Sequence, residues 1–146
     1  MIVRQYEPGD RDGLIGLWLA CDLVRPWNDP ARDIERKLGL GDGGLLVAVH
    51  EVTVCGSVMV GYDGHRGWIN YLATDPSMRR QGIGRMLVAK AEALLARRGC
   101  PKINLQIRST NAQVAEFYRR IGYADDDVLS MGKRLIDDGA STAESD

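Results

Sequence analysis

The sequence predicts one mixed α/β (α+β) domain, in which a mostly antiparallel central sheet of about seven strands carries about four helices on its two faces. Three observations support this fold class. Apolar residues recur with the period of a strand in some segments and with the period of a helix in others. Three strand-like runs between residues 45 and 74 are separated only by short turns, which is typical of an antiparallel meander. The next strand follows a helix, so it needs a crossover and a parallel pairing.

The N-terminal part of the chain is predicted to form one strand and two helices. Residues 1–6 alternate between the two faces as a strand does. Asp10 can cap the first helix, while Asp29 and Pro30 suit the N-cap and first position of a second helix that ends at Gly39. The first helix has one apolar stripe at the spacing i, i+3, i+4 and i+7, formed by Leu14, Leu17, Trp18 and Cys21.

The rest of the chain continues this alternation. The meander is predicted as strands 45–49, 54–62 and 68–74, followed by a third helix from 83 to about 98 that Gly99 ends. Then come a fifth strand at 102–107, a fourth helix at 111–120 and two short closing strands within 123–134. We expect the domain to span residues 1–136 and the acidic residues 137–146 to form a disordered tail.

Composition and charge restrict the class of protein. A length of 146 residues with 45% hydrophobic residues suits one globular domain. The formal net charge of -1 gives no overall attraction to nucleic acid or to an anionic membrane, so neither is expected as a partner. The chain shows no apolar run as long as a membrane span and no signal peptide, which favours a cytoplasmic protein. Its three cysteines and two histidines lack metal-ligand spacing, so no metal is expected.

A glycine-containing loop is the most informative motif of the chain. The sequence Arg79-Arg80-Gln81-Gly82-Ile83-Gly84-Arg85 lies between the predicted strand 68–74 and the third helix. The first amides of a helix have no partner within the helix, and the helix dipole adds partial positive charge there. Glycines allow a phosphate to approach the backbone, and two arginines precede the turn. The loop therefore predicts a pyrophosphate site, although the glycines alone could also serve only the turn.

Two familiar phosphate-binding loops do not fit. A Walker A loop would need Lys and Ser or Thr after Gly84, where this chain has Arg85 and Met86. A dinucleotide-binding fingerprint would need a third glycine at Leu87. The loop instead resembles the Arg/Gln-x-x-Gly-x-Gly loop of the GNAT acetyltransferases, which binds the pyrophosphate of coenzyme A. The order of the predicted elements is also similar to the GNAT fold over residues 1–135.

The resemblance implies a path for acetyl-CoA. The run Leu72-Ala73-Thr74-Asp75-Pro76 resembles the end of the family's central strand, where a bulge splits the fourth strand from the fifth and the pantetheine arm bonds the freed backbone. Asn111 stands where the family often uses an Asn to bind this arm, although it could equally be only a helix N-cap. The cofactor-binding residues implied in this way are Leu72, Ala73, Thr74, Arg79, Arg80, Gln81, Gly82, Ile83, Gly84, Arg85 and Asn111.

The resemblance also implies catalytic groups. Tyr118 and Gly122-Tyr123 resemble the family's Tyr-x-x-x-Gly-Phe/Tyr signature, in which the tyrosine protonates the departing thiolate; the alternative is a plain core tyrosine. Some members that acetylate protein N-termini carry a Glu where this chain has Gln106, and glutamine cannot accept a proton. Asp63 and His65 remain candidates for the base, and Asp63 also for binding the acceptor, unless they are ordinary turn residues. A water chain or a neutral substrate would also suffice.

The segment between the first two predicted helices suggests the acceptor site. Asp22, Arg25 and Trp27 offer both charges and an aromatic wall where the GNAT fold lines its acceptor pocket, although a plain packing element is an equal alternative. Together with residues 61–67 and 132–136, this segment is similar to the bacterial YpeA-like acetyltransferases.

We therefore expect an acetyl-CoA-dependent N-acetyltransferase that acts by direct transfer in a ternary complex. The acceptor would be a primary amine of a small molecule or peptide, and a homodimer would be common for such a fold. A CoA-binding sensor without turnover, which Gln106 favours, and a nucleotide-binding protein are the alternatives.

Overall fold

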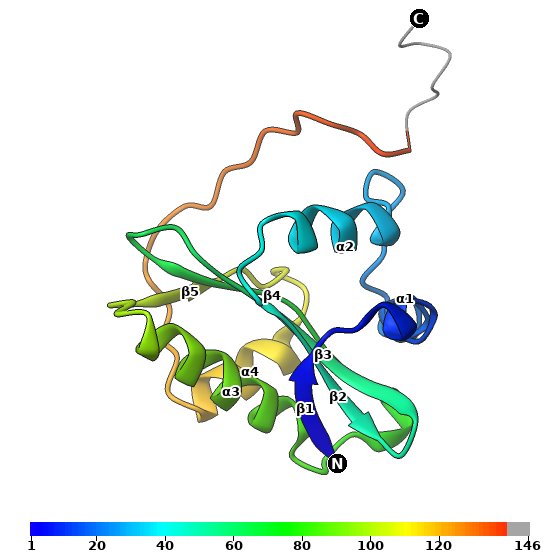
Figure 1. Ribbon diagram of the computed structural model, residues 1–146. Helices are drawn as coiled ribbons and strands as arrows, with labels where there is room; N and C mark the ends of the chain where they lie inside the picture. Colours follow the sequence, from blue (N-terminus) through cyan, green and yellow to red (C-terminus); the bar gives the residue numbers. More distant parts are fainter. Residues whose placement is uncertain (140–146) are drawn as a thin grey trace, which may run out of the picture.

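The computed structural model describes residues 1–139, which form one five-stranded sheet and four α-helices (Figure 1). The sheet has the order β1-β2-β3-β4-β5, with β1 Ile2–Gln5, β2 Leu45–His50, β3 Thr53–Tyr62, β4 Gly67–Thr74 and β5 Ile103–Leu105. The helices are α1 Arg11–Ala20, α2 Pro30–Gly39, α3 Ile83–Arg97 and α4 Ala112–Arg120, with short 3-10 turns η1 Pro8–Asp10 and η2 Pro76–Met78. No helix within residues 1–139 has the length and hydrophobicity that a bilayer span needs.

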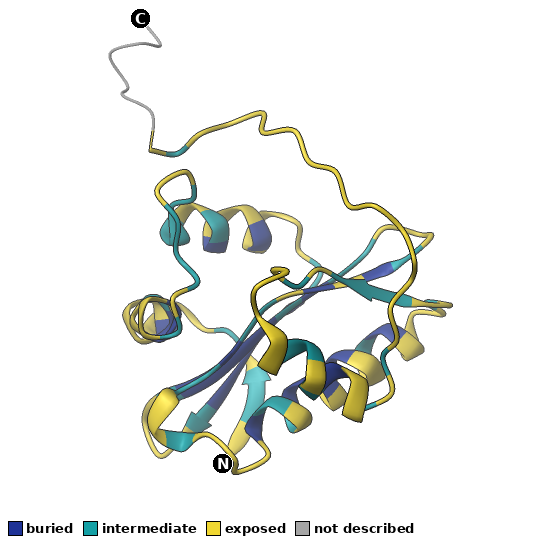
Figure 2. Cartoon of the chain, turned by 180° about the vertical axis from the view of Figure 1, so that it is seen from behind, coloured by how far each residue is buried: buried dark blue, intermediate teal, exposed yellow. Residues whose placement is uncertain are grey.

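The sheet separates two apolar cores, which confirms the prediction of helices on both faces (Figure 2). Successive residues of β2 point to opposite faces: Leu45 and Val47 join one core, and Leu46 and Ala48 join the other. The core beneath α1 and α2 contains the buried residues Leu14, Leu17, Trp18, Ile34 and Ala73. The core beneath α3 and α4 contains Val58, Val60, Ile83, Leu87, Val88, Ala91, Leu95 and Tyr118.

The sheet divides between β4 and β5, as expected. These two strands are parallel and pair only from Gly67 with Ile103 to Ile69 with Leu105, so the second half of β4 continues beyond the end of the pairing. On the side of β3, the register shifts between Ser57 and Met59, where the backbone of Tyr71 has a φ of 50°. This β-bulge bends β4 after the residues that pair with β5, so the end of β4 departs from the direction of that pairing.

The two closing strands predicted within 123–134 are a misprediction. Residues 121–136 contain no strand, and the sheet has five strands in residues 1–139 rather than about seven. Asp127 has a φ of 54°, which interrupts an extended strand, and Asp126 is bound by the side chains of Lys102 and Asn104 rather than by a backbone ladder. Residues 124–136, which we call the C-terminal strap, run past β5 from α4 toward α2 (Figure 1).

The strap ends against α2. Asp138 accepts hydrogen bonds from the backbone N–H of Asp29 at 2.8 Å and from both terminal nitrogens of Arg36 at 3.0 and 2.6 Å. This part of the predicted acidic tail is therefore in contact with the domain. Residues 140–146 of that tail lie outside the described residues.

Candidate active site

The N-terminus of α3 is open to a ligand. Gly82 is its N-cap in the left-handed conformation (φ 78°), and no side chain caps the first amides of the helix. The N-termini of α2 and α4 differ, because Asp29 and Asn111 accept hydrogen bonds from their first turns. The uncapped amides of α3, with the positive end of the helix dipole, suit an anion.

The two glycines of the loop have different roles. Gly82 needs its positive φ, which a residue with a Cβ adopts only with strain. At Gly84, a Cβ would lie 3.4 Å from Cζ of Phe117 and 3.6 Å from Oγ1 of Thr74, which are ordinary contact distances. The protein therefore leaves room for a side chain at Gly84. These distances also place the start of α3 directly beside the end of β4.

Positively charged residues precede and follow the turn at this helix end. Arg79, Arg80 and Arg85 are exposed, and the salt bridges formed within residues 1–139 involve other arginines, such as Arg4, Arg36 and Arg119. Arg79 lies near Cys21: burial raises the pKa of the Cys21 thiol, and the positive charge of Arg79 opposes that rise. The site thus combines uncapped amides with cationic side chains that no carboxylate of the described residues neutralises.

The predicted cofactor-arm residues border the division of the sheet. Leu72 and Thr74 are half-buried and Ala73 is buried, in the part of β4 that extends past its pairing with β5. Thr74 accepts a hydrogen bond from Sγ of Cys21 at 3.2 Å through its backbone carbonyl. Asn111 follows β5 and accepts the N–H of Val114 at 3.2 Å through Oδ1, so it does serve as an N-cap. Its amide NH₂ group is not used in that bond and can still donate.

Tyr118 is a buried ring with an accessible hydroxyl. Its side chain is only 5% exposed and packs edge to face against Phe117 and Tyr123. Within residues 1–139 no buried side-chain oxygen lacks a partner, and Tyr118 forms no hydrogen bond there, so its hydroxyl reaches the surface. Burial raises the pKa of this phenol, which keeps it protonated at neutral pH.

The predicted acceptor loop is held by its own contacts. Nη1 of Arg25 donates to the carbonyls of Asp22 and Val24 at 2.8 and 3.0 Å, while the carboxylate of Asp22 is exposed. The ring of Trp27 lies 5.6 Å from the guanidinium carbon of Arg134, a cation–π contact with the strap. Arg25 and Trp27 therefore have partners in the chain.

The candidate bases of the β3–β4 turn lie elsewhere. Asp63 accepts hydrogen bonds from the backbone N–H groups of Arg66 and His65 and from the indole of Trp68. The two backbone bonds lower the pKa of its carboxyl, which makes it a weak base. This turn precedes the paired half of β4, and both views place it across the molecule from the loop of Trp27 (Figures 1 and 2). Gln106 contacts Ser130.

A polar cluster that the sequence did not reveal lies between α1, α2 and the bulge. The hydroxyl of Tyr71 donates to Oδ2 of Asp33 at 2.6 Å, and its ring stacks on Trp18 with centroids 3.8 Å apart. Ser57 donates to the carbonyl of Tyr71 and accepts from the indole of Trp18. The bulge causes this arrangement, and simple alternation along β4 contains no signal for it.

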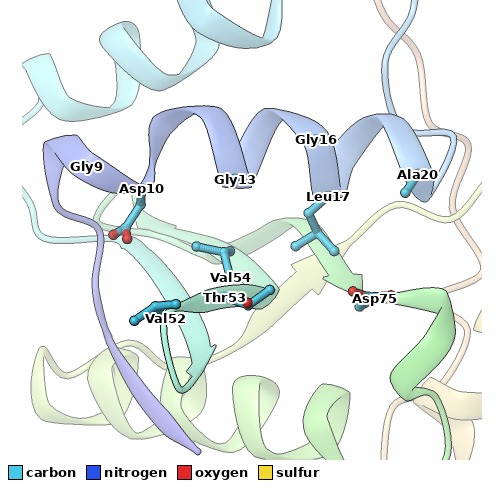
Figure 3. Close-up of a pocket in the computed structure, with 10 residues that line it drawn as sticks. All are labelled: Gly9, Asp10, Gly13, Gly16, Leu17, Ala20, Val52, Thr53, Val54 and Asp75. Atoms are coloured by element: carbon cyan, nitrogen blue, oxygen red, sulfur yellow. The ribbon is translucent and has the colours of Figure 1, made fainter.

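A hollow of about 410 Å³ beside α1 is separate from this site (Figure 3). It lies over the start of β3, on the other side of β4 from β5, and none of the predicted site residues lines it. Its two carboxylates are already bound, Asp10 by Arg4 and Asp75 by Ser77. Within residues 1–139, no group of three or more His, Cys, Asp or Glu residues could hold a metal ion.

The divided sheet and the open helix end beside it match the arrangement that the resemblance to acetyl-CoA-dependent transferases implies, and comparison with known proteins supports this class. The model of the Acetyltransferase (GNAT) family matches residues 14–123, so the chain belongs to this family and is an acetyl-CoA-dependent N-acetyltransferase. It is 46% identical over 138 residues to an acetyltransferase of Pectobacterium atrosepticum, covering 94% of this chain and 98% of that protein.

Two solved structures show the same fold. Glucosamine-6-phosphate N-acetyltransferase from Arabidopsis thaliana has a TM-score of 0.69 at 23% identity, over 92% of this chain and 97% of that chain. The aminoglycoside N-acetyltransferase AAC(6')-Iy, solved in complex with CoA, has a TM-score of 0.74 at 15% identity, over 92% and 94% of the two chains. The family model and the 46% identical relative confirm the resemblance to the GNAT family, while the similarity to the YpeA-like group stays a prediction.

Proposed function

We propose that this chain transfers the acetyl group of acetyl-CoA directly to a primary amine of a small molecule or peptide, in a ternary complex. One observation supports this most strongly: the uncapped N-terminus of α3 lies against the end of β4, where β4 has separated from β5. An anion site that is continuous with unpaired strand backbone suits a ligand with a diphosphate and a peptide-like arm.

The cofactor contacts follow from this geometry. The amides of residues 83–85 and the side chains of Arg79, Arg80 and Arg85 would hold the pyrophosphate, with Gln81 and Gly82 forming the turn. The backbone of residues 72–74 would bond the pantetheine arm, and Asn111 would donate to it through its free NH₂ group.

The chain's groups would then stabilise the charges of acyl transfer. Acetyl-CoA supplies a thioester whose oxygen gains negative charge and whose sulfur leaves. Backbone N–H groups of residues 72–74 would stabilise the oxygen, because preorganised donors act strongly in a site that excludes water. Tyr118 would donate its proton to the sulfur, because its hydroxyl is not engaged in another hydrogen bond within residues 1–139.

The acceptor amine would approach from the α1–α2 face. Asp33 and Tyr71 provide a polar pair beside the bulge of β4 on this face. Asp33 is also paired with Arg36 at 3.1 Å, and its remaining lone pairs would accept a hydrogen bond from the amine. Gln106 and Asp63 are poorer candidates for the base, for the reasons given above. Two proteins of the same fold, a glucosamine-6-phosphate N-acetyltransferase and an aminoglycoside N-acetyltransferase, are named for acceptors that carry amines on sugars. Their names support an amine acceptor here.

Thiol release from acetyl-CoA in the presence of an amine panel tests this proposal. The panel would contain aminoglycosides, amino sugars, free amino acids and peptides. At least one amine should cause release of CoA. The rate should saturate with each of the two substrates, and the double-reciprocal plots should intersect, as a ternary complex requires. CoA binding without thiol release for any amine would support the sensor alternative.

A matched pair of variants tests the location of the cofactor. The double variant Arg79→Gln/Arg80→Gln should weaken CoA binding at least tenfold in calorimetry, because two charge-assisted contacts are lost. Arg97→Gln makes the same kind of change at the opposite end of α3 and should leave the affinity unchanged. Equal affinities for all three proteins would place the pyrophosphate elsewhere.

A further inference from the structure

Tyr71 has a strained backbone that three separate contacts hold in place. Its φ of 50° lies in the left-handed region, which a bulky residue adopts only at a cost in energy. Its ring stacks on Trp18, its hydroxyl donates to Asp33, and its carbonyl accepts a hydrogen bond from Oγ of Ser57 at 2.8 Å. Strain of this kind persists where the surrounding structure determines the backbone, and such positions cluster at functional sites. The surrounding side chains therefore maintain the bulge at Tyr71.

Ser57 links this bulge to the core beneath α1. Its side chain is fully buried, and its Oγ lies 2.9 Å from the indole nitrogen of Trp18, which is also fully buried. An indole N–H can only donate, so Oγ of Ser57 is the acceptor in that bond, and its own hydrogen remains for the carbonyl of Tyr71. The hydroxyl of Ser57 therefore holds the Tyr71 carbonyl in one direction, toward β3.

The direction of the Tyr71 carbonyl determines the direction of the next N–H. A peptide bond is planar and trans, so the N–H of Leu72 points opposite to the carbonyl of Tyr71. Because that carbonyl points toward Ser57 of β3, the N–H points to the side of β4 that faces β5. The pairing of β4 with β5 ends at Ile69, and within residues 1–139 neither neighbouring strand places a residue opposite Leu72. The N–H of Leu72 is thus directed at the division of the sheet.

We infer that Ser57 is a positioning residue for acetyl transfer: its hydroxyl holds the peptide of Tyr71 so that the N–H of Leu72 donates to the thioester oxygen of acetyl-CoA. This inference rests on the proposed function, in which the backbone of residues 72–74 would bind the thioester. A donor that is already oriented needs no reorganisation when negative charge develops on the oxygen, which is why such donors are effective. Ser57 itself would not touch acetyl-CoA, because it is buried between Trp18 and Tyr71.

Infrared spectroscopy of bound acetyl-CoA tests this role without an acceptor amine. An isotopic label at the acetyl carbonyl isolates its stretching band from the amide bands of the protein. A hydrogen bond weakens the C=O bond, so Ser57→Ala should move the band of bound acetyl-CoA to a higher wavenumber than in the native chain. Ser57→Cys places a weaker donor at the same position, and its band should lie between the other two. If Ser57→Ala does not fold, the band of Ser57→Cys decides the test.

Two further measurements separate positioning from a general loss of structure. CoA lacks the acetyl oxygen, so Ser57→Ala should bind CoA as tightly as the native chain in calorimetry. With an amine of the panel that causes release of CoA, kcat should fall roughly 10- to 100-fold while KM for acetyl-CoA stays unchanged. This loss is smaller than the roughly 100- to 1,000-fold that removal of a whole donor causes, because the N–H of Leu72 remains and only its orientation is lost.

Cys55→Ala is the matched control. Cys55 is fully buried on the same strand, and this substitution also removes one atom beyond Cβ, so the band, the CoA affinity and kcat should equal those of the native chain. A native chain that binds neither CoA nor acetyl-CoA would overturn the proposed function and the role of Ser57 together. If the native chain binds both but Ser57→Ala leaves the band in place, the proposed function stands and Ser57 has no positioning role. Loss of CoA affinity in Ser57→Ala would show that Ser57 only supports the structure.

Discussion

At the scale of single residues, the hydroxyl of Tyr118 can be removed with little effect on the fold. The ring fills the core beneath α3 and α4, but its hydroxyl forms no hydrogen bond within residues 1–139. Tyr118→Phe should therefore change the free energy of unfolding by less than about 0.5 kcal/mol. If the phenol protonates the leaving sulfur, kcat should fall roughly 100-fold. Thiol-release kinetics and urea unfolding measure the two effects.

The neighbouring tyrosine provides the matched control. Tyr123 packs against Tyr118, and its hydroxyl donates to Glu92 at 2.9 Å. Tyr123→Phe should lower stability by about 1 kcal/mol through the lost hydrogen bond while turnover stays unchanged. Full turnover by the Tyr118 variant would remove its assignment as the acid, and equal losses in both variants would indicate a general packing effect.

At the scale of elements, a substitution at the start of α3 can distinguish an effect on helix stability from an effect on ligand binding. The protein itself has room for a Cβ at Gly84. Gly84→Ala should thus preserve stability or raise it by up to about 1 kcal/mol, since alanine favours the helix. A phosphate held against the backbone has no such room, so CoA affinity should fall at least tenfold. Calorimetry and urea unfolding measure the affinity and the stability.

Gly16 offers the same substitution on another helix. It lies within α1, where nothing comes within 4 Å of an added Cβ. Gly16→Ala should raise stability similarly and leave CoA binding unchanged. If Gly84→Ala binds CoA as tightly as the native chain, the diphosphate does not approach the backbone at this point.

The elements also show what the sequence could predict. The starts of α2 and α4 were predictable because Asp29 and Asn111 cap them through residues two and three positions along the chain. The turn of the glycine loop was predictable because it also depends on residues that are close together in the sequence. Asp138 and Arg36 are 102 residues apart, and no local pattern links them. Tyr71 points toward Asp33 because of a bulge, and the closing segment forms no strands because its contacts are made by side chains.

At the scale of the whole molecule, three carboxylates connect different elements of the fold. Asp10 connects the start of α1 to β1 through a bidentate pair with Arg4. Asp42 binds the buried Lys37, which joins α2 to the sheet, and Asp138 joins the strap to α2. The Arg4 hydrogen bonds lower the pKa of Asp10, and those of Arg36 lower the pKa of Asp138. Burial opposes the effect at Asp42, but its hydrogen bonds with Lys37 and Gly44 still lower its pKa.

These pKa shifts predict how stability depends on pH. Each carboxyl has a lower pKa in the folded chain than the value of about 3.9 for an unfolded aspartate, so the unfolded chain takes up protons first as the pH falls. The free energy of unfolding should be nearly constant above about pH 5 and should decrease below about pH 4. Urea unfolding at a series of pH values across this range measures how the free energy of unfolding depends on pH.

Substitution of the carboxylates should flatten this curve. At pH 7, Asp10→Asn should cost about 1–2 kcal/mol, and Asp42→Asn about 2–3 kcal/mol because Lys37 stays buried without its counter-charge. The difference from the native chain should shrink toward pH 3, since the native carboxylates are then protonated on unfolding. Asp12→Asn, at a carboxylate whose side chain is 96% exposed, should follow the native curve throughout. Variants that run parallel to the native chain down to pH 3 would show that other groups control its acid unfolding.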